Sequence, residues 1–230
     1  MILDPLLILT VYLFVFGYIF EGKFRSGEDE SRIEYGITVF LGLAIYRVFS
    51  EVIGTTAASI RVNVNYVKKI VFPLEILPII DIIAALYSFF ITIALVILGQ
   101  FFLGEGLNIQ ALWFPLLVFC FLLLLAGLGW ALSSVTVYFL DISHIIPIVT
   151  ISLLFGSAIF YPVEKIPESI WTYLKFNPIL QLIDSSRRVM MWGEIPSPIV
   201  IFGVSLFSVI VFYFGFYIFR LLKKGFADVL

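Results

Sequence analysis

The sequence predicts an all-α integral membrane protein with six transmembrane helices, and three observations support this. The 230 residues are 62% hydrophobic and 13% charged, whereas about a quarter of the residues in an ordinary soluble domain are charged. Several runs are long enough to cross a bilayer, which takes about 20 helical residues. These runs are apolar on all sides, a pattern that favours helices over a barrel, whose strands alternate polar and apolar positions.

The six spans are expected at residues 3–20, 37–60, 74–103, 112–140, 145–161 and 199–222. The N-terminal run has no basic start and no small-residue cleavage site, so it is expected to stay as the first span. The stretch DISH is expected to form a short turn between the fourth and fifth spans. No internal repeat or soluble domain is visible, so residues 1–230 are predicted to form one transmembrane domain.

The positive-inside rule predicts the orientation. Basic residues close to the span ends favour the cytosolic side, and on one side they adjoin the spans closely: Arg61, Lys68, Lys69, Arg220, Lys223 and Lys224. Basic residues in the opposite loops are interleaved with acidic ones. We therefore expect a multi-pass membrane protein with residues 61–73 and both termini in the cytosol.

The segment between the fifth and sixth spans is too polar to span a membrane and too apolar for a solvated loop. It predicts two short helices within residues 163–196. Pro167 suits the first turn of one, and Asn177 followed by Pro178 is typical of an N-cap before a second. Gly193 is expected to end that second helix.

Two interpretations of these short helices stay open. Asp184 and Arg188 are four residues apart and can pair on one helical face. Trp171, Tyr173 and Trp192 would suit an anchor at the membrane interface. The alternative is a lid over a translocation path.

Polar residues within the spans are few. Arg47 and Glu51 are four apart and are expected to form an intramembrane ion pair, which either fixes helix register or lies beside a substrate path. Asp81 is expected to reach the interface, and His144 to have a structural or capping role. Cys120 is expected to face lipid or the core, and as the sole cysteine it allows no intramolecular disulfide.

Catalytic motifs are missing from the sequence. It contains no G-x-x-x-x-G-K-[ST] phosphate loop and no H-E-x-x-H motif. One histidine supports neither a metal site nor a Ser/His/Asp set, and a net charge of −2 suggests no nucleic-acid partner. A membrane-embedded lipid-modifying enzyme would need such a constellation, so we expect no enzyme and no bound metal.

The first span is rich in aromatic side chains. Tyr12 and Phe16 share one helical face, and Phe14 and Tyr18 share another. Aromatic rings offer platforms for the flat, C–H-rich faces of sugars, but in this aromatic-rich chain they can equally pack against lipid or helices. Both interpretations stay open.

Five stretches, in order, resemble the ABC type-2 permeases that export O-antigen, capsule and teichoic-acid polymers: NVNYVKKIVFPLEILPI, YFLDISHIIPI, SAIFYPVEKIP, FNPILQLIDSSR and the terminal FADVL. The resemblance covers almost the whole chain. It implies a permease subunit that pairs with a second copy and with two ATPase subunits. These partners would bind ATP and magnesium, so no cofactor is expected in this chain. It further implies a location in the inner (plasma) membrane and export of a lipid-linked polysaccharide across it, with O-antigen as the expected polymer.

The resemblance also implies roles for particular residues. Residues 61–73 would rest in a cleft of the ATPase, with Asn65, Tyr66, Lys68, Lys69, Phe72, Pro73 and Glu75 as coupling residues. The first and fifth spans would frame the polymer path, with Tyr12, Phe16, Tyr18, Phe155, Phe160 and Tyr161 along it. The two short helices would form an outer gate that includes Trp171, Asp184, Arg187 and Arg188.

One departure and two alternatives accompany the resemblance. Family members usually carry an amphipathic helix before the first span, whereas this sequence begins almost directly at LDPLL, which puts contacts made by such a helix in doubt. Exporters of teichoic acid, or of drugs and small lipids, share the architecture and are the alternative functions.

Overall fold

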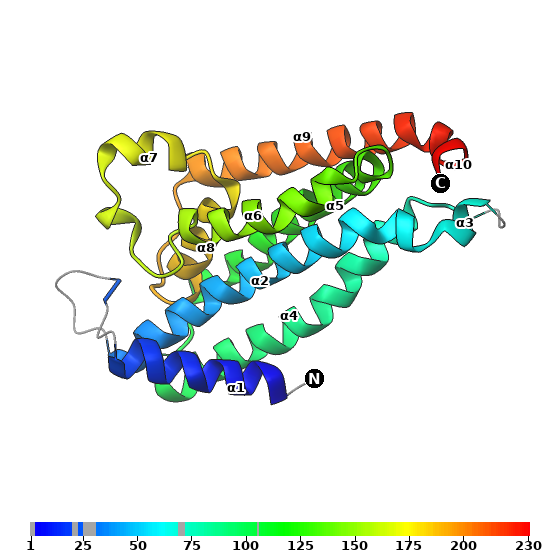
Figure 1. Cartoon of the computed structure of the whole chain (residues 1–230). Helices are drawn as coiled ribbons and strands as arrows, with labels where there is room; N and C mark the ends of the chain where they lie inside the picture. Colours follow the sequence, from blue (N-terminus) through cyan, green and yellow to red (C-terminus); the bar gives the residue numbers. More distant parts are fainter. Residues whose placement is uncertain (1–2, 20–22, 25–30, 69–71, 105) are drawn as a thin grey trace. The chain divides into compact units, whose positions relative to one another are not determined.

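The computed structural model describes residues 3–19, 23–24, 31–68, 72–104 and 106–230 of the chain; for residues 3–6, 17–19 and 103 only the backbone is described. These residues form helices and contain no strand (Figure 1). The predicted all-α class is therefore confirmed for the described residues.

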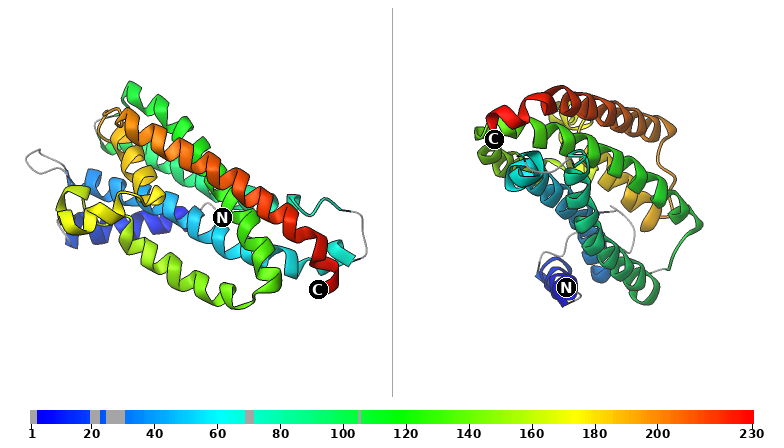
Figure 2. Two further views of the ribbon diagram at one scale, coloured as in Figure 1. Left: turned by 90° about the horizontal axis from the view of Figure 1, so that it is seen from above. Right: turned by 90° about the vertical axis from the view of Figure 1, so that its right-hand side faces the viewer.

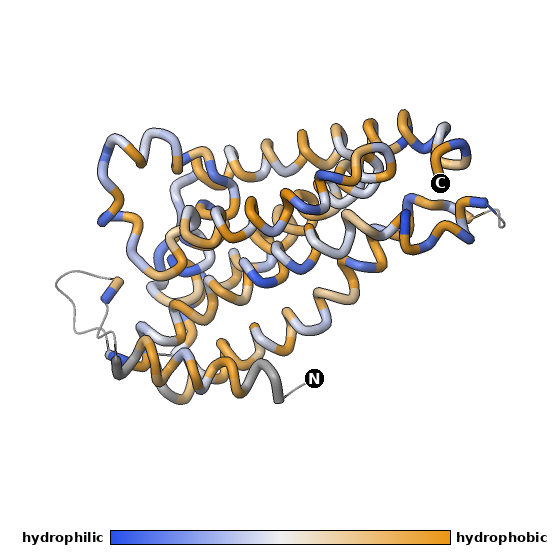
Figure 3. Tube along the Cα trace, in the orientation of Figure 1, coloured by the Kyte–Doolittle hydropathy of each residue, from blue (hydrophilic) through white to orange (hydrophobic). Residues whose placement is uncertain are grey.

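Within the described residues, four helices are long and apolar enough to cross a membrane: Arg32–Val62, Ile76–Phe102, Ile109–Tyr138 and Pro198–Val229. They correspond to α2 (Arg32–Val62), α4 (Ile76–Leu103), α5 (Phe114–Tyr138, after the short helix η2, Ile109–Trp113) and α9 (Pro198–Leu222). Figure 3 shows that most residues along α4 and α9 are apolar, as expected for helices in lipid.

Two further apolar helices are shorter. The first combines α1 (Leu3–Tyr12) with a π-helical continuation, η1 (Leu13–Ile19), and the second is α6 (Asp141–Gly156). The predicted fifth span, residues 145–161, is thus displaced: the helix begins at Asp141 and ends at Gly156. The chain turns after Gly156, where Ala158 has a φ of 51°, in the left-handed region that residues other than glycine seldom adopt.

The DISH stretch does not form a turn. Its four residues lie in the first turn of α6, so only Phe139 and Leu140 separate α5 from α6. Asp141 begins the helix, where a carboxylate is favoured by the helix dipole. The polar cluster that suggested a loop is therefore part of a helix start.

The chain divides into two compact units, each built from three separate segments. Unit 1 comprises Met1–Arg47, Tyr87–Val118 and Leu153–Phe202, and unit 2 comprises Val48–Leu86, Phe119–Ser152 and Gly203–Leu230. The helices α2, α4, α5 and α9 each contribute a segment to both units.

Unit 1 contains the two short helices expected after the fifth span, α7 (Glu168–Leu174) and α8 (Pro178–Met190). The Asn177 side chain accepts hydrogen bonds from the backbone N–H groups of Ile179 and Leu180, at 3.0 and 3.4 Å. Gly193, with a φ of 61°, follows the helix. The predicted cap and stop of α8 are therefore confirmed.

In unit 2, α5 and α9 approach so closely that their backbones touch. A Cβ atom added at Gly215 would overlap the carbonyl group of Gly127, and one added at Gly127 would overlap the backbone of Val211. Both views in Figure 2 show the two helices side by side. Small residues at such a crossing permit close packing in membrane helices. The Trp130 ring on α5 also packs on the Phe216 ring on α9, with 4.9 Å between ring centroids.

The short helix α3 (Val64–Lys68) follows α2, and α10 (Phe226–Val229) packs against it in unit 2. Phe226 is fully buried, with its ring 5.8 Å from that of Phe219 and 6.2 Å from that of Tyr138. The Tyr138 hydroxyl donates to the Leu222 carbonyl at 2.8 Å. The C-terminal residues are therefore anchored against the protein.

Candidate functional site

Four of the residues expected along a polymer path form one chain of ring contacts in unit 1. Phe16 stacks on Phe160 with 5.4 Å between centroids and 17° between planes. Tyr12 lies 5.7 Å from Phe16, and Phe155 lies 6.4 Å from Phe160. Sequence reasoning assigned these rings to two spans, and the structure brings them together.

Tyr161 extends this group, because its hydroxyl donates to the Phe155 carbonyl at 2.5 Å. We call Tyr12, Phe16, Phe155, Phe160 and Tyr161 the aromatic cluster. Phe155 is 61% exposed, so the aromatic cluster presents an open ring face at one end. The side chain of Tyr18, the sixth predicted path residue, lies outside the described residues.

Tyr35 on α2 supports the aromatic cluster, and sequence reasoning missed it. Its hydroxyl donates to the Phe160 carbonyl at 3.2 Å, and its ring lies 6.5 Å from that of Phe16. Tyr35 is 5% exposed and belongs to a core with Phe24 and Val39. A contact across 125 residues leaves no local signal in the sequence.

Arg187 holds the turn that carries Phe160. Its guanidinium donates to the carbonyl oxygens of Ala158 at 2.7 Å, Ile159 at 2.6 Å and Thr38 at 3.2 Å. It lies over the Phe24 ring, 4.3 Å from the centroid, and the residue is 1% exposed. The planar fork of arginine suits several acceptors at once. Arg187, predicted as a gate residue, therefore joins α8 to α2 and to the turn after α6; its gating role stays a prediction.

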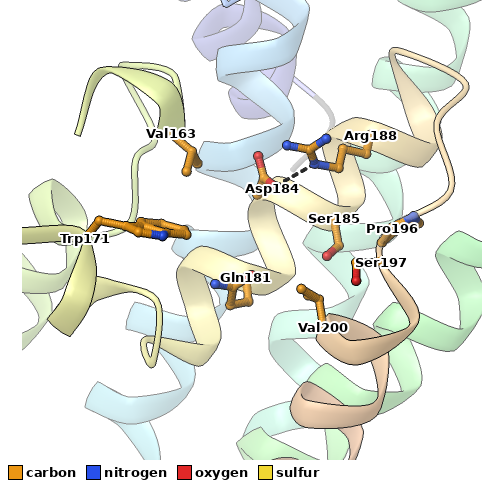
Figure 4. Close-up of a pocket in the computed structure, with 9 residues that line it drawn as sticks. All are labelled: Val163, Trp171, Gln181, Asp184, Ser185, Arg188, Pro196, Ser197 and Val200. Carbon is orange, nitrogen blue, oxygen red and sulfur yellow. Dashed lines mark hydrogen bonds and ion pairs between the residues drawn. The ribbon is translucent and has the colours of Figure 1, made fainter. Parts of the chain in front are cut away.

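The other three predicted gate residues line one cavity of about 310 Å³ in unit 1. Trp171 comes from α7, and Asp184 and Arg188 come from α8 (Figure 4). The predicted pairing is confirmed, since Arg188 Nε lies 2.8 Å from Asp184 Oδ2. Arg188 also contacts Glu194 at 2.9 Å and Glu164 at 3.7 Å.

The residues expected to couple to an ATPase lie around α3 in unit 2. Asn65, Tyr66, Lys68 and Pro73 are exposed, and the rings of Tyr66 and Phe72 are 4.9 Å apart. Lys69 lies outside the described residues. The described part of this stretch thus offers an exposed surface with an aromatic pair and a lysine.

Glu75 differs from the other coupling residues. Its carboxylate accepts hydrogen bonds from Lys223 at 2.8 and 3.0 Å, and its carbonyl accepts one from Trp130 Nε1 at 2.9 Å. Glu75 therefore ties the start of α4 to the end of α9 and to α5. Burial raises the pKa of its carboxyl, but the hydrogen bonds and charge of Lys223 outweigh burial, and the pKa lies below its ordinary value.

The Glu75–Lys223 ion pair predicts a pH-dependent stability. A carboxyl whose pKa is lowered on folding stabilises the fold above its unfolded pKa, and this contribution is lost as the pH falls through the lower folded pKa. We expect Glu75→Gln to lower the free energy of unfolding by about 1 kcal/mol at neutral pH. We also expect the melting temperature of this variant to fall less on acidification than that of the parent protein. Melting curves of the purified protein from neutral pH to below the ordinary Glu pKa would measure both effects.

Lys224→Ala is the matched control for this ion pair, because Lys224 is adjacent to Lys223 but exposed. It should leave the melting temperature and its acid dependence unchanged. An acid dependence of Glu75→Gln that matched the parent protein would contradict the assigned role.

The remaining polar residues lie as follows. Arg47 ends unit 1 and Glu51 belongs to unit 2; both are exposed, and their pairing stays a prediction. Asp81 is half-buried, and among the described residues its Oδ2 has no hydrogen-bond partner. His144 is exposed in the first turn of α6. Cys120 is buried, with Sγ 3.3 Å from Ser205 Oγ, which settles its place in the core.

Comparison with known families assigns the chain. Residues 1–191 match the family model described as ABC-2 type transporter. The chain belongs to the ABC-2 type transporter family. As an ABC-2 transporter chain it is a transport component and a multi-pass membrane protein, in agreement with its apolar helices.

Named relatives of this ABC-2 transporter chain include polysaccharide exporters. It is 28% identical to the polysialic acid transport protein KpsM of Escherichia coli, over 95% of this chain and 83% of that protein. It is 25% identical to the O-antigen export system permease protein RfbA of Klebsiella pneumoniae, over 100% of this chain and 85% of that protein. It is 22% identical to the O-antigen export system permease protein RfbA of Myxococcus xanthus, over 98% of this chain and 85% of that protein.

Proposed function

We propose that this chain is the permease subunit of an ATP-driven exporter that moves a lipid-linked polysaccharide, with O-antigen as the expected polymer, across the inner membrane. The observation that carries the proposal is the aromatic cluster, because it joins rings from α1, η1 and the end of α6 into one surface. Such rings can hold successive sugars by their apolar faces. The names of the relatives support the same substrate class.

The proposed topology has six spans, made by the four long apolar helices and the two shorter ones, Leu7–Phe16 and Asp141–Gly156. Both termini and residues 61–73 lie in the cytosol. The short helices α7 and α8 then lie at the outer face as a gate. Two permease copies would form the polymer path between them.

Two copies of a separate ATPase would bind ATP and magnesium and dock on the stretch around α3. ATP binding would bring the ATPases together and displace α3, which packs against α10. The Glu75–Lys223 ion pair connects the start of α4 with the end of α9. A displacement on the cytosolic side would therefore reach both helices.

Charge reversal tests this docking surface. In Lys68→Glu/Lys69→Glu, two cations would become anions at the proposed interface, and such repulsion lowers association while leaving folding intact. We expect recovery of the ATPase with the tagged permease to fall about tenfold, which corresponds to about 1.4 kcal/mol, at equal membrane insertion. Affinity co-purification from membranes would measure it.

Lys175→Glu is the control, because Lys175 is an exposed lysine after α7, at the proposed outer face. It should leave ATPase recovery unchanged. Full recovery of the ATPase with the double variant would remove the coupling role from this stretch.

A further inference from the structure

The cavity beside α7 and α8 is lined by both apolar and polar side chains. Trp171, Val163, Pro196 and Val200 supply apolar surface, and Gln181, Asp184, Ser185, Arg188 and Ser197 supply polar groups. Figure 4 shows the Trp171 indole reaching toward Gln181 and Asp184, with Ser185 and Ser197 on the far side. The volume of about 310 Å³ is at the lower end of the range of about 300–1,000 Å³ for small-molecule sites.

Charge disfavours an anionic ligand in this cavity. Among the described residues that line it, Arg188 is the single cation and Asp184 the single anion. Arg188 pairs with Asp184 and also contacts Glu194 and Glu164, which do not line the cavity. The one cation of the lining is therefore already engaged by carboxylates, and a phosphate or carboxylate would have to compete with them for the guanidinium. A neutral ligand with many hydroxyls avoids this cost.

The polar groups that line the cavity are held in place before any ligand arrives. Ser185 is 2% exposed, and the Gln181 amide donates to the Lys175 carbonyl at 3.0 Å. The start of α8 is fixed by Asn177, whose amide donates to the Gly156 carbonyl at 3.0 Å. Preformed polar groups lose little conformational entropy on binding, which favours recognition of a small ligand.

We propose that this cavity binds one neutral sugar unit, with the apolar face of the pyranose ring on Trp171 and its hydroxyls on Gln181, Asp184 and Ser185. An aromatic face opposite amide, carboxylate and hydroxyl groups satisfies both the C–H face and the hydroxyl rim of a sugar. The inference rests on the proposed function for the source of the sugar, a unit of the exported polymer. It implies that this polymer contains neutral sugars.

Saturation-transfer NMR on the purified full chain in detergent tests the proposal. The probes are the methyl glycosides of glucose, galactose, mannose and rhamnose, with glucose 6-phosphate and N-acetylneuraminic acid as charged counterparts. We expect saturation of the ring protons of at least one neutral glycoside, with a signal at least several-fold above that of either charged sugar. Trp171→Ala should abolish this signal, and Trp171→Phe, which keeps an aromatic face, should retain part of it.

Tyr173→Ala is the matched control, because Tyr173 lies on the same helix, is 79% exposed and does not line the cavity. It should bind like the parent chain. The proposal is overturned if no neutral glycoside binds, if Trp171→Ala binds as well as Tyr173→Ala, or if the charged sugars bind as well as the neutral ones. Because free glycosides need no ATPase or export, this assay can fail while polymer export succeeds, and the reverse.

Discussion

Replacement of Arg187 by lysine is expected to destabilise the protein by about 3 kcal/mol, because hydrogen bonds from a charged donor are each worth about 1.5–3 kcal/mol. Lysine keeps the charge but loses the planar fork that reaches the carbonyl groups of Thr38, Ala158 and Ile159. For a chain of this size the melting temperature should fall by roughly 6–12 °C. Thermal unfolding of the purified protein in detergent would measure the shift.

The next residue provides the control for Arg187→Lys. Arg188→Lys makes the same substitution one position along, where the side chain is 32% exposed and a lysine can still pair with Asp184. It should shift the melting temperature much less. Gly42→Ala tests the same contact from α2, since an added Cβ would overlap the Arg187 guanidinium. Equal shifts for Arg187→Lys and Arg188→Lys would contradict the structural role of Arg187.

Replacement of Gly215 by alanine is expected to cost about 2–3 kcal/mol, the upper part of the range for overpacking. The added methyl group would overlap the carbonyl group of Gly127, which is backbone and cannot rotate away. The helices α5 and α9 would have to separate, and the Trp130 ring contacts with Phe212 and Phe216, at 5.2 and 4.9 Å, would weaken. A lower melting temperature and a reduced yield of folded protein would report the change.

Gly203→Ala is the control on the same helix. Within the described part of the chain, nothing lies within 4 Å of a Cβ built at Gly203, and alanine is a better helix former than glycine. This variant should be as stable as the parent chain or slightly more stable. If Gly215→Ala behaved like Gly203→Ala, the close approach of α5 and α9 would be wrong.

Local signals in the sequence were sufficient for most helices. Hydropathy located the long helices, and the Asn177–Pro178 pair located the start of α8, because capping depends on residues two and three positions away. The DISH stretch misled the same reasoning. A polar cluster suits a loop and the first turn of a helix equally well, and its contacts decide between them.

Long-range contacts were beyond sequence reasoning. Arg187 and Arg188 are neighbours of the same type, yet one is buried and the other half-exposed. The acceptors of Arg187 are backbone carbonyls, one of them 149 residues away, and no side chain marks such partners. The same holds for Glu75, whose partner Lys223 is 148 residues away. The resemblance implied a role for Glu75 at the ATPase interface, and that role stays a prediction. Composition gave no sign of the cavity beside α7 either, since it depends on how α7 and α8 meet.

Surface display of polymer tests the central claim most directly. The chain and its ATPase would be co-expressed in cells that synthesise the lipid-linked polymer but lack their own exporter, and polymer on intact cells would be measured by antibody binding. We expect surface polymer only when both proteins are present and the phosphate loop of the ATPase is intact. Polymer that stayed inside cells containing the chain and an active ATPase, or that reached the surface equally without the chain, would contradict a role as the permease subunit of a polysaccharide exporter.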